Sequence, residues 1–358
     1  MKSAWNLDFG LLFPVFVLLI LSLTTLFSVN FDLFRNQLIF TFIAIVAFLF
    51  FSQVNYKVIQ LYGKAIYVVS LVLLLLVLLL GIESRGAIRW VEILGFRIQF
   101  SEILKPFLAV SLASYLVQAN NSSFLSLLKI FIFTLIISFL IFVQPDLGSA
   151  VIYIFVAVLT FIFFGFPLKF FLISTLSFGA TMPLAWKFLH DYQKERILTF
   201  INPGKDPLGT SYNAIQSIIA VGSGMFFGKG LGQGTQSRLS FLPERHTDFI
   251  FATISEQLGF VGALVILVSF GFLLYKIFDI FQNSQDSFCK IFSACAFFII
   301  LVQLFVNIGM NIGILPVVGV TLPFVSYGGS SLLSNFILLG LLSSIQRNVK
   351  EKKVLEIG

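Results

Sequence analysis

Five consecutive polar or charged residues stand directly before a long apolar run in the segment FLPERHTDFIF, at positions 241–251. The ionisable members of this group are Glu244, Arg245, His246 and Asp248. A carboxylate or an imidazole at such a boundary can transfer protons, and a guanidinium can bind an anion. The alternative role is structural, because the dipole of a helix that starts here favours Asp248 in its first turn, and Thr247 can cap that helix.

A second set of charges lies in GAIRWVEILGFRIQFSEILKPFL, at positions 86–108. Its charged residues are Arg89, Glu92, Arg97, Glu102 and Lys105. Glu102 and Lys105 stand three apart at the start of an apolar helix, so their side chains lie on one face and can form an ion pair. Charged groups in apolar segments usually face a protein interior or a watery cavity. The pair is therefore either a structural salt bridge or part of a binding site.

Two further segments interrupt apolar runs with residues that favour turns. In QPDLGSA the interrupting residues are Gln144, Pro145 and Asp146. Asp146 can simply cap the helix that follows. Near the C-terminus, residues 310–336 are rich in Gly, Pro and Ser, and they include Ser326 and Gly328. Such an irregular backbone is tolerated at membrane depth where protein buries it or where it lines a cavity.

The segment VGSGMFFGKGLGQGTQSR, at positions 221–238, is rich in glycine and carries the basic residues Lys229 and Arg238. Repeated glycine lets backbone N–H groups converge on an anion, and the two basic side chains would add positive charge. The spacing is not that of a Walker loop, since only three residues separate Gly224 from Gly228. The segment is therefore either an anion-binding loop or a flexible or re-entrant loop.

The composition identifies the class of protein that carries these motifs. Of the 358 residues, 58% are hydrophobic and 11% are charged, and apolar segments of about 20 residues recur along the chain. We therefore predict an all-α polytopic membrane helix bundle with about ten transmembrane helices, formed by residues 1–358 as a single integral membrane domain. The expected spans are 9–29, 36–53, 62–82, 101–118, 126–143, 147–165, 167–187, 248–277, 288–313 and 326–347.

The distribution of basic residues predicts the orientation in the membrane. Ten spans put both termini on one side, and residues 188–247 form the one long loop, between spans seven and eight. Eleven basic residues fall on the side of the termini, against four in the short loops of the other side, which indicates cytoplasmic termini. The net charge of +7 then follows from topology and requires no nucleic acid. The polar motifs lie on the outer side, where they can surround one pocket for a lipid-linked substrate or a transported solute.

Four segments, in their order along the chain, closely resemble the signatures of the SEDS family (shape, elongation, division and sporulation). They are GAIRWVEILGFRIQFSEILK, QPDLGSA, GSGMFFGKGLGQGTQSRLSFLPERHTDFIFATISEQLGF and GILPVVGVTLPFVSYGGSS, within about residues 86–335. The PERHTDFIF segment is more similar to the elongation members of the family than to the division members. This chain departs from the family pattern at Ile88, Phe100 and Gln257.

The resemblance implies a peptidoglycan glycosyltransferase that polymerises lipid II on the outer face of the bacterial cytoplasmic (inner) membrane, for cell elongation and shape. The essential carboxylate of the family matches Asp248, and its S-E-x-x-K pair matches Glu102 and Lys105. Its Q-P-D motif matches Gln144, Pro145 and Asp146. The implied partners are a class B penicillin-binding protein, which carries a transpeptidase domain, and the rest of the elongation machinery.

The implied reaction suggests a role for each group. A sugar hydroxyl attacks the anomeric carbon of a second sugar whose leaving group is a lipid pyrophosphate, so the step needs a base and cations for the departing charge. Asp248 is the expected base, with inversion at the anomeric carbon. The expected substrate contacts are Arg89, Glu102, Lys105, Lys229, Arg238, Glu244, Arg245 and His246. No cofactor is certain, and a divalent cation (Mg²⁺ or Mn²⁺), held by the pyrophosphate and by Asp248 or Glu102, is a candidate.

Three other functions remain open from the sequence. A lipid II flippase or another transporter would line a pathway with polar groups, yet the centres of spans one, two, three, five and six are almost uniformly apolar. A division-specific paralogue would catalyse the same reaction in another machinery. A noncatalytic scaffold for cell-wall enzymes would work without the carboxylate of Asp248.

Overall fold

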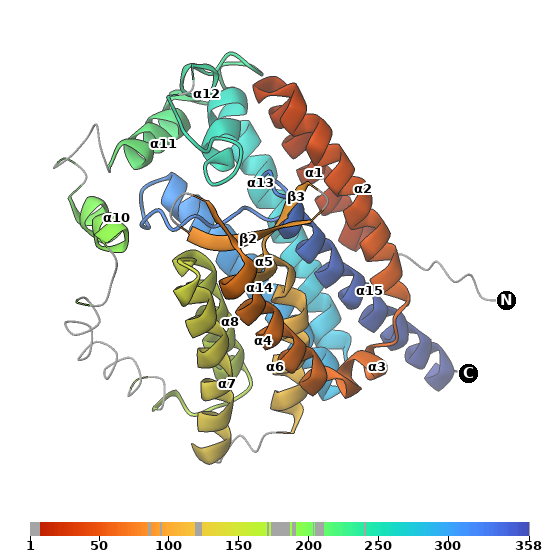
Figure 1. Ribbon diagram of the computed structural model, residues 1–358. Helices are drawn as coiled ribbons and strands as arrows, with labels where there is room; N and C mark the ends of the chain where they lie inside the picture. The colour runs from red at the N-terminus through yellow and green to blue at the C-terminus, as the bar shows by residue number, and fades with distance from the viewer. Residues whose placement is uncertain are drawn as a thin grey trace.

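Long helices form most of the structure, a computed structural model that describes residues 8–84, 87–93, 95–118, 124–169, 172, 187, 191–202, 204, 211–239 and 241–357. The long helices pack side by side as a bundle (Figure 1). They are α1 (Phe9–Val29), α2 (Phe31–Gln53), α4 (Gly63–Leu80), α6 (Lys105–Val117), α7 (Phe124–Val143), α8 (Leu147–Phe163), α13 (Ile250–Asn283), α14 (Ser287–Asn311) and α15 (Gly329–Ile357). The shorter helices are α3 (Tyr56–Leu61), α5 (Phe100–Ile103), α10 (Asp191–Ile201), α11 (Tyr212–Ser223) and α12 (Thr235–Arg238).

The helices agree with the predicted membrane spans. Within the described ranges, six helices are long and apolar enough to cross a membrane: α1, α2, α4, α13, α14 and residues 329–348 of α15. Three shorter apolar helices are α6, α8 and residues 128–143 of α7. The predicted seventh span, residues 167–187, lies almost entirely outside the described residues. The prediction of a polytopic helical membrane protein is confirmed.

The two ends of the described chain lie at one end of the bundle. Asp8, just before α1, is hydrogen-bonded to Gln346 near the end of α15. At the other end of α1, the hydroxyl of Ser28 donates to the side chain of Gln257 at 2.9 Å. Along the bundle, α2 and α15 pack closely because Gly340 brings α15 against the carbonyl oxygen of Phe48. The segment around Gln257 is therefore at the opposite end of the bundle from both chain ends.

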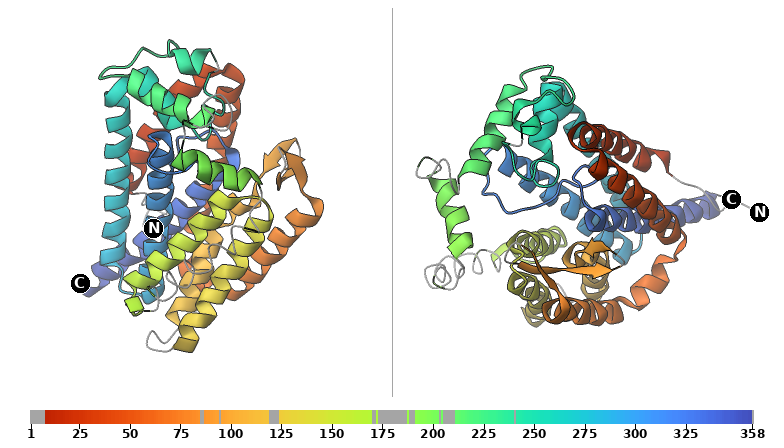
Figure 2. Two further views of the ribbon diagram at one scale, coloured as in Figure 1. Left: turned by 90° about the vertical axis from the view of Figure 1, so that its left-hand side faces the viewer. Right: turned by 45° about the horizontal axis from the view of Figure 1, so that its top comes forward.

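A small antiparallel sheet between α4 and α5 differs from the all-helical prediction. Its strands are β1 (Ile82–Ser84), β2 (Ala87–Ile93) and β3 (Phe96–Ile98), in the order β1-β2-β3. Trp90 is paired with Ile82, and Glu92 is paired with Arg97. Gly95 turns the chain between β2 and β3 with a φ of 81°. The sheet extends beyond the ends of α4 and α6 (Figure 2).

The glycine-rich loop between α11 and α12 joins two parts of a broken helix. At Gly259 the backbone of α13 leaves the helical region, with φ 66° and ψ −157°. The N–H groups of residues 229–230 donate to the carbonyl groups of residues 256–257, at the end of the first part. The N–H groups of residues 260–261, at the start of the second part, donate to the carbonyl groups of residues 225–226. The loop therefore satisfies backbone groups that the break leaves without helical partners.

The same loop encloses the carboxylate of Glu256, which is fully buried. That carboxylate accepts hydrogen bonds from the N–H groups of Gln236 and Ser237, each at 2.9 Å. The ammonium group of Lys229 lies 3.2 Å from it. Backbone N–H groups and a lysine thus converge on an anion, but the N–H groups belong to Gln236 and Ser237 and not to the glycines, and the anion is a side chain of the protein itself.

Replacement of Glu256 by alanine is expected to lower the free energy of unfolding by about 3–5 kcal/mol, because it removes the shared acceptor of several buried donors. Lys229→Met is the matched variant, and we expect a loss of about 1 kcal/mol or less, because the ammonium is 29% exposed. Thermal unfolding of the purified protein in detergent measures both. Equal midpoints for Glu256→Ala and the wild type would show that the loop does not brace the break.

Candidate active site

A cavity of about 590 Å³ brings three of the predicted motifs together. It lies between the small sheet, α5, the turn at residues 244–248 and the irregular segment at residues 319–331. Its charged lining residues are Arg89, Arg97, Glu102, Glu244 and Asp248. The volume is typical of a small-molecule site, and the mixture of carboxylates and guanidinium groups suits proton transfer next to a bound anion.

The backbone that carries Asp248 is held at four successive carbonyl groups, those of residues 245–248. The donors are, in order, the hydroxyl of Thr253, the N–H of Tyr327, the hydroxyl of Ser326, and the side-chain amides of Asn307 and Asn311, at 2.7–3.1 Å. These donors come from three separate parts of the chain. The turn is therefore fixed by the surrounding bundle, and Asp248 lines the cavity from a rigid backbone.

The start of α13 corrects two predictions. The helix begins at Ile250 with Phe249 as its N-cap, and no side chain caps it. Asp248 therefore precedes the helix and does not lie in its first turn. The hydroxyl of Thr247 donates to the carboxylate of Glu244 at 2.9 Å, so the prediction that Thr247 caps the helix is also wrong. The physical reason is that the carbonyl contacts of residues 245–248 hold this backbone outside the helix.

Glu102 and Lys105 form the predicted ion pair, with 2.6 Å between Lys105 Nζ and Glu102 Oε1. Both side chains are buried. The predicted fourth span is divided between them, because Pro106 lies in the first turn of α6 and cannot continue the hydrogen bonding of α5. Glu102 lines the cavity, and its second oxygen, Oε2, is buried without a hydrogen-bond partner among the described residues. One oxygen is thus held by Lys105, and the other has a free acceptor site within the part of the chain that the structure describes.

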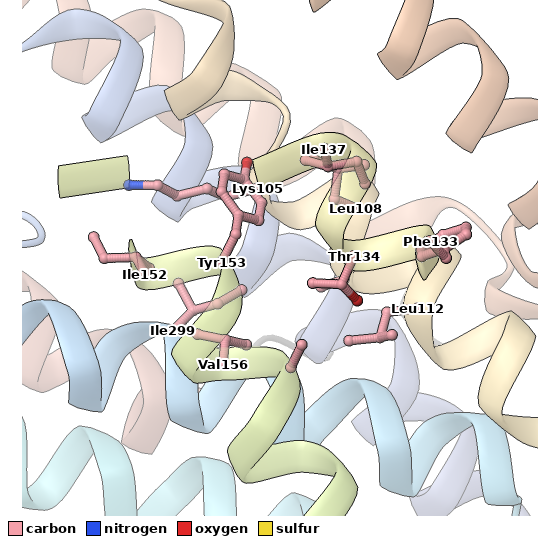
Figure 3. A pocket seen from close by; sticks show the side chains of 12 residues that line it. Lys105, Leu108, Leu112, Phe133, Thr134, Ile137, Ile152, Tyr153, Val156 and Ile299 are labelled. Atoms are coloured by element: carbon pink, nitrogen blue, oxygen red, sulfur yellow. The ribbon is translucent and has the colours of Figure 1, made fainter. Parts of the chain in front are cut away.

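A second, apolar cavity lies on the other side of Lys105 (Figure 3). It has a volume of about 30 Å³ and is lined by side chains of α6, α7, α8 and α14, among them Phe133 and Ile299. The aliphatic stem of Lys105 contributes to this lining. The lysine therefore packs its stem against apolar groups and brings its ammonium to Glu102.

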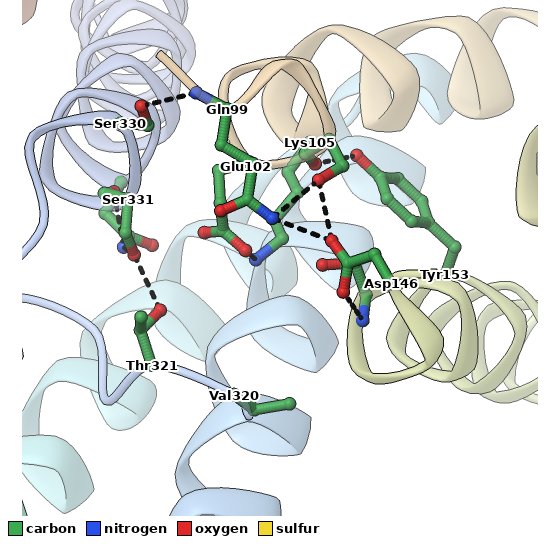
Figure 4. A network of polar contacts seen from close by, with 12 residues as sticks. Gln99, Glu102, Lys105, Asp146, Tyr153, Val320, Thr321, Ser330 and Ser331 are labelled. Carbon is green, nitrogen blue, oxygen red and sulfur yellow. Dashed lines mark hydrogen bonds and ion pairs between the residues drawn. The ribbon is translucent and has the colours of Figure 1, made fainter. Parts of the chain in front are cut away.

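The QPD motif forms the support behind the cavity wall. The carboxylate of Asp146 accepts from the side-chain amide of Gln99 at 2.7 Å and from the hydroxyl of Ser101 at 2.9 Å (Figure 4). Its other oxygen accepts from the N–H of Ser149 at 3.1 Å, which confirms the predicted cap of α8. Pro145 lies in the turn before α8, and the amide of Gln144 donates to the carbonyl group of Leu74 at 2.8 Å. The motif thus ties α8 to α4 and to the segment before α5.

Of the other predicted site residues, some line the cavity and some do not. Gly328 lines it, and Ser326 acts through the backbone of Thr247. The ring of His246 packs edge-on against Tyr327. Partial burial lowers the pKa of the Arg245 guanidinium, although arginine remains charged at neutral pH. Lys229 and Arg238 belong to the glycine-rich loop and its short helix, and the structure does not bring them into the cavity lining.

Some residues at the site were not assigned to it from the sequence. They are Trp90, Arg97 and Thr321 in the lining, and Asn307 and Asn311 behind Asp248. The two asparagines did give a signal, because they stand four apart on one face of an otherwise apolar helix, and polar groups at such positions are costly to bury. Arg97 could be placed only once the hairpin was known.

The cavity offers carboxylate oxygens that could hold a metal ion. Among the described residues, no group of three or more His, Cys, Asp and Glu side chains is arranged to hold a metal ion. Glu102 and Asp248 line the same cavity, and no described residue is hydrogen-bonded to Oε2 of Glu102. These carboxylates fit a hard divalent cation that takes its remaining oxygen ligands from phosphate groups and water.

A family model and several relatives match the chain over most of its length. Residues 3–351 match the model of a family described as cell cycle protein, which groups FtsW, RodA and SpoVE. The peptidoglycan glycosyltransferase MrdB of Escherichia coli (strain K12) is 37% identical over 305 residues, 84% of this chain and 81% of MrdB. The probable peptidoglycan glycosyltransferase FtsW of Buchnera aphidicola is 38% identical over 298 residues, 81% of this chain and 74% of that protein. Stage V sporulation protein E of Bacillus subtilis (strain 168) is 35% identical over 337 residues, 90% of this chain and 88% of that protein.

Solved structures agree with this assignment. One chain comes from a peptidoglycan synthase complex described as showing structural coordination of polymerization and crosslinking; it matches with a TM-score of 0.84 and 28% identity, over 96% of this chain and 99% of that chain. The rod shape determining protein RodA of Thermus thermophilus matches with a TM-score of 0.73 and 25% identity, over 96% of this chain and 97% of RodA. From its motifs, its fold and its relatives, the chain belongs to the FtsW, RodA and SpoVE family of cell cycle proteins, the SEDS family that the motifs indicated.

Proposed function

We propose that the protein is a peptidoglycan glycosyltransferase that polymerises lipid II. The observation that carries this proposal is the cavity in which Asp248 lies together with Arg89 and Arg97. It combines a base for a sugar hydroxyl with cations for a departing pyrophosphate, on a backbone that the bundle holds rigidly. The relatives named peptidoglycan glycosyltransferases support the same reaction.

In the proposed reaction, Asp248 accepts the proton of the acceptor's 4-hydroxyl as the hydroxyl oxygen attacks the anomeric carbon of the donor. The new C–O bond forms while the bond to the lipid pyrophosphate breaks, with inversion at the anomeric carbon. Arg89 and Arg97 stabilise the departing charge. Glu102 contacts the sugar or its hydroxyls through Oε2, and Lys105 fixes its position. A divalent cation held by Asp248 or Glu102 would further neutralise pyrophosphate when bound.

We place this cavity on the outer face of the bacterial cytoplasmic (inner) membrane, with both termini cytoplasmic and residues 1–358 as one integral membrane domain. Two observations support this orientation: basic residues are in excess on the side of the termini, and the contact of Asp8 with Gln346 puts the two ends of the described chain at one end of the bundle. We propose a class B penicillin-binding protein as the partner, within the elongation machinery. The matched chain from a synthase complex that joins polymerization to crosslinking supports this partner.

Reconstitution tests the function directly. The full-length protein is placed in liposomes with its penicillin-binding partner and purified lipid II, and both glycan strands and lipid II translocation are measured. We expect glycan strands that a muramidase digests. Translocation of lipid II without any glycan product would contradict the proposal and favour the flippase.

A further inference from the structure

We infer that Asn311 is a positioning residue: its side-chain amide holds open the first turn of α13 and thereby keeps the carboxylate of Asp248 in the cavity. This inference rests on the role proposed above for Asp248. It concerns the last residue of a different element, α14, which does not line the cavity and is hydrogen-bonded to the backbone carbonyl of Asp248.

The amide of Asn311 occupies the place of a helical hydrogen bond. In an α-helix, the carbonyl group of residue 248 would accept from the N–H of residue 252. Here Nδ2 of Asn311 donates to the carbonyl oxygen of Asp248 at 3.0 Å, and Oδ1 of Asn311 accepts from the N–H of Ala252 at 3.1 Å. The next hydrogen bond, from Thr253 N–H to the carbonyl of Phe249, is direct at 3.0 Å. The inserted amide therefore determines that the helix begins after Asp248.

The orientation of this amide is fixed by its surroundings. On one side, Nδ2 faces the carbonyl oxygens of Asp248 and Asn307, and the second of these lies at 2.8 Å. On the other side, Oδ1 faces the N–H of Ala252 and the hydroxyl of Ser217, the latter at 3.3 Å. A flipped amide would set an oxygen against two carbonyl oxygens and an NH₂ against an N–H. Asn311 is also fully buried, so water cannot compensate for such a flip.

Asn307, one turn earlier on α14, ties the same carbonyl group to the segment that lines the cavity. Its amide donates to the carbonyl oxygen of Asp248 at 3.1 Å and to that of Val320 at 2.7 Å. Gly319, next to Val320, lies so close that a Cβ atom there would be 3.5 Å from Oδ2 of Asp248. The two asparagines therefore set the place of Asp248 between α13 and the segment that lines the cavity. Without Asn311, residues 248 and 252 can close the direct helical bond, which draws Asp248 into the helix and turns its side chain.

A purely structural role is the competing account, since two buried amides also satisfy orphan groups at a helix start. The variant Asn311→Ala separates the two accounts, because the groups that it frees can bond to each other. The N–H of Ala252 can then reach the carbonyl of Asp248, while the hydroxyl of Ser217 keeps its 2.9 Å bond to the backbone carbonyl of residue 311. We therefore expect a folded protein with a misplaced carboxylate.

The kinetic arm compares Asn311→Ala with Gln303→Met in the reconstituted polymerisation assay. Gln303 lies on the same buried stripe of α14, and neither of its side-chain polar atoms has a hydrogen-bond partner within the described ranges, so it is the matched control. We expect kcat to fall about 10- to 100-fold in Asn311→Ala, as for a reacting group displaced by about 1 Å, with KM within about twofold of the wild type. Gln303→Met should keep both constants. An unchanged kcat in Asn311→Ala, or a fall matched by loss of the thermal unfolding transition, would overturn the inference.

A second experiment measures how accessible the side chain at position 248 is, and it does not depend on enzymatic activity. Asp248→Cys is made in a chain carrying Cys289→Ala and Cys295→Ala, and its reaction rate with a water-soluble sulfonate thiol reagent is measured with and without Asn311→Ala. We expect the rate of thiol modification to fall several-fold when Asn311 is replaced by alanine. Equal rates would refute the positioning role. If the rate falls while Asp248→Asn still polymerises at the wild-type rate, the positioning stands and the proposed catalytic function fails.

Discussion

Asp248→Asn is expected to lower the rate of glycan polymerisation by about 10²- to 10⁴-fold, the usual contribution of a general base. Asparagine has the shape of aspartate, but its amide cannot accept the proton of the attacking hydroxyl. Residues 245–248 take part in these four contacts only through their backbone carbonyl groups, and the substitution leaves those groups in place. The variant should therefore keep the turn and the fold. Initial rates with lipid II measure the effect, and partner binding and thermal unfolding confirm that the protein is intact.

The matched control for this experiment is Asp32→Asn, because Asp32 is an exposed carboxylate in the first turn of α2 and is absent from the cavity lining. It should polymerise at the wild-type rate, which separates the loss of one particular carboxylate from the loss of any negative charge. If Asp248→Asn made as much glycan product as the wild type, Asp248 would not be the general base, and the noncatalytic scaffold would be favoured.

Much of the site could be predicted because polar residues are rare in this chain. A charge within an apolar segment needs a partner or a cavity, and Glu102, Lys105 and Asp248 each have one or both. The spacing of Glu102 and Lys105 was sufficient to predict their ion pair. The resemblance to a family then supplied what spacing cannot, namely that the segments near residues 102 and 248 belong to one site.

Other features depend on contacts between distant parts of the chain and have no local signature. The break at Gly259 is stable because the loop at residues 225–230 supplies its hydrogen bonds. Asp248 stays outside α13 because Asn311 inserts into the first turn. In both cases a tertiary contact overrides the local preference.

The hairpin of β2 and β3 is formed by neighbouring segments, and it was missed for another reason. Its strands alternate too briefly to be distinguished from a loop, although Gly95 between them was a usable turn signal.

Lys105→Met is expected to give the second large effect, a loss of about 3–5 kcal/mol in the free energy of unfolding, because it leaves the carboxylate of Glu102 buried without its cation. The methionine side chain fills the apolar cavity as the lysine stem does, so the lost packing is small. Polymerisation should fall as well, because Glu102 without its cation no longer holds Oε2 at the same place in the cavity wall. Thermal unfolding in detergent and initial rates with lipid II measure the two consequences separately.

The double variant Glu102→Leu with Lys105→Met determines whether the pair serves the fold alone. Replacing both members of a buried ion pair by apolar groups of similar size is often neutral or stabilising, so the unfolding midpoint should return toward that of the wild type. If Glu102 contacts the substrate through its unpartnered oxygen, polymerisation stays low despite the recovered stability. Recovery of both stability and polymerisation would instead make this a structural salt bridge, and the substrate contacts of the cavity would then rest on Arg89, Arg97 and Asp248.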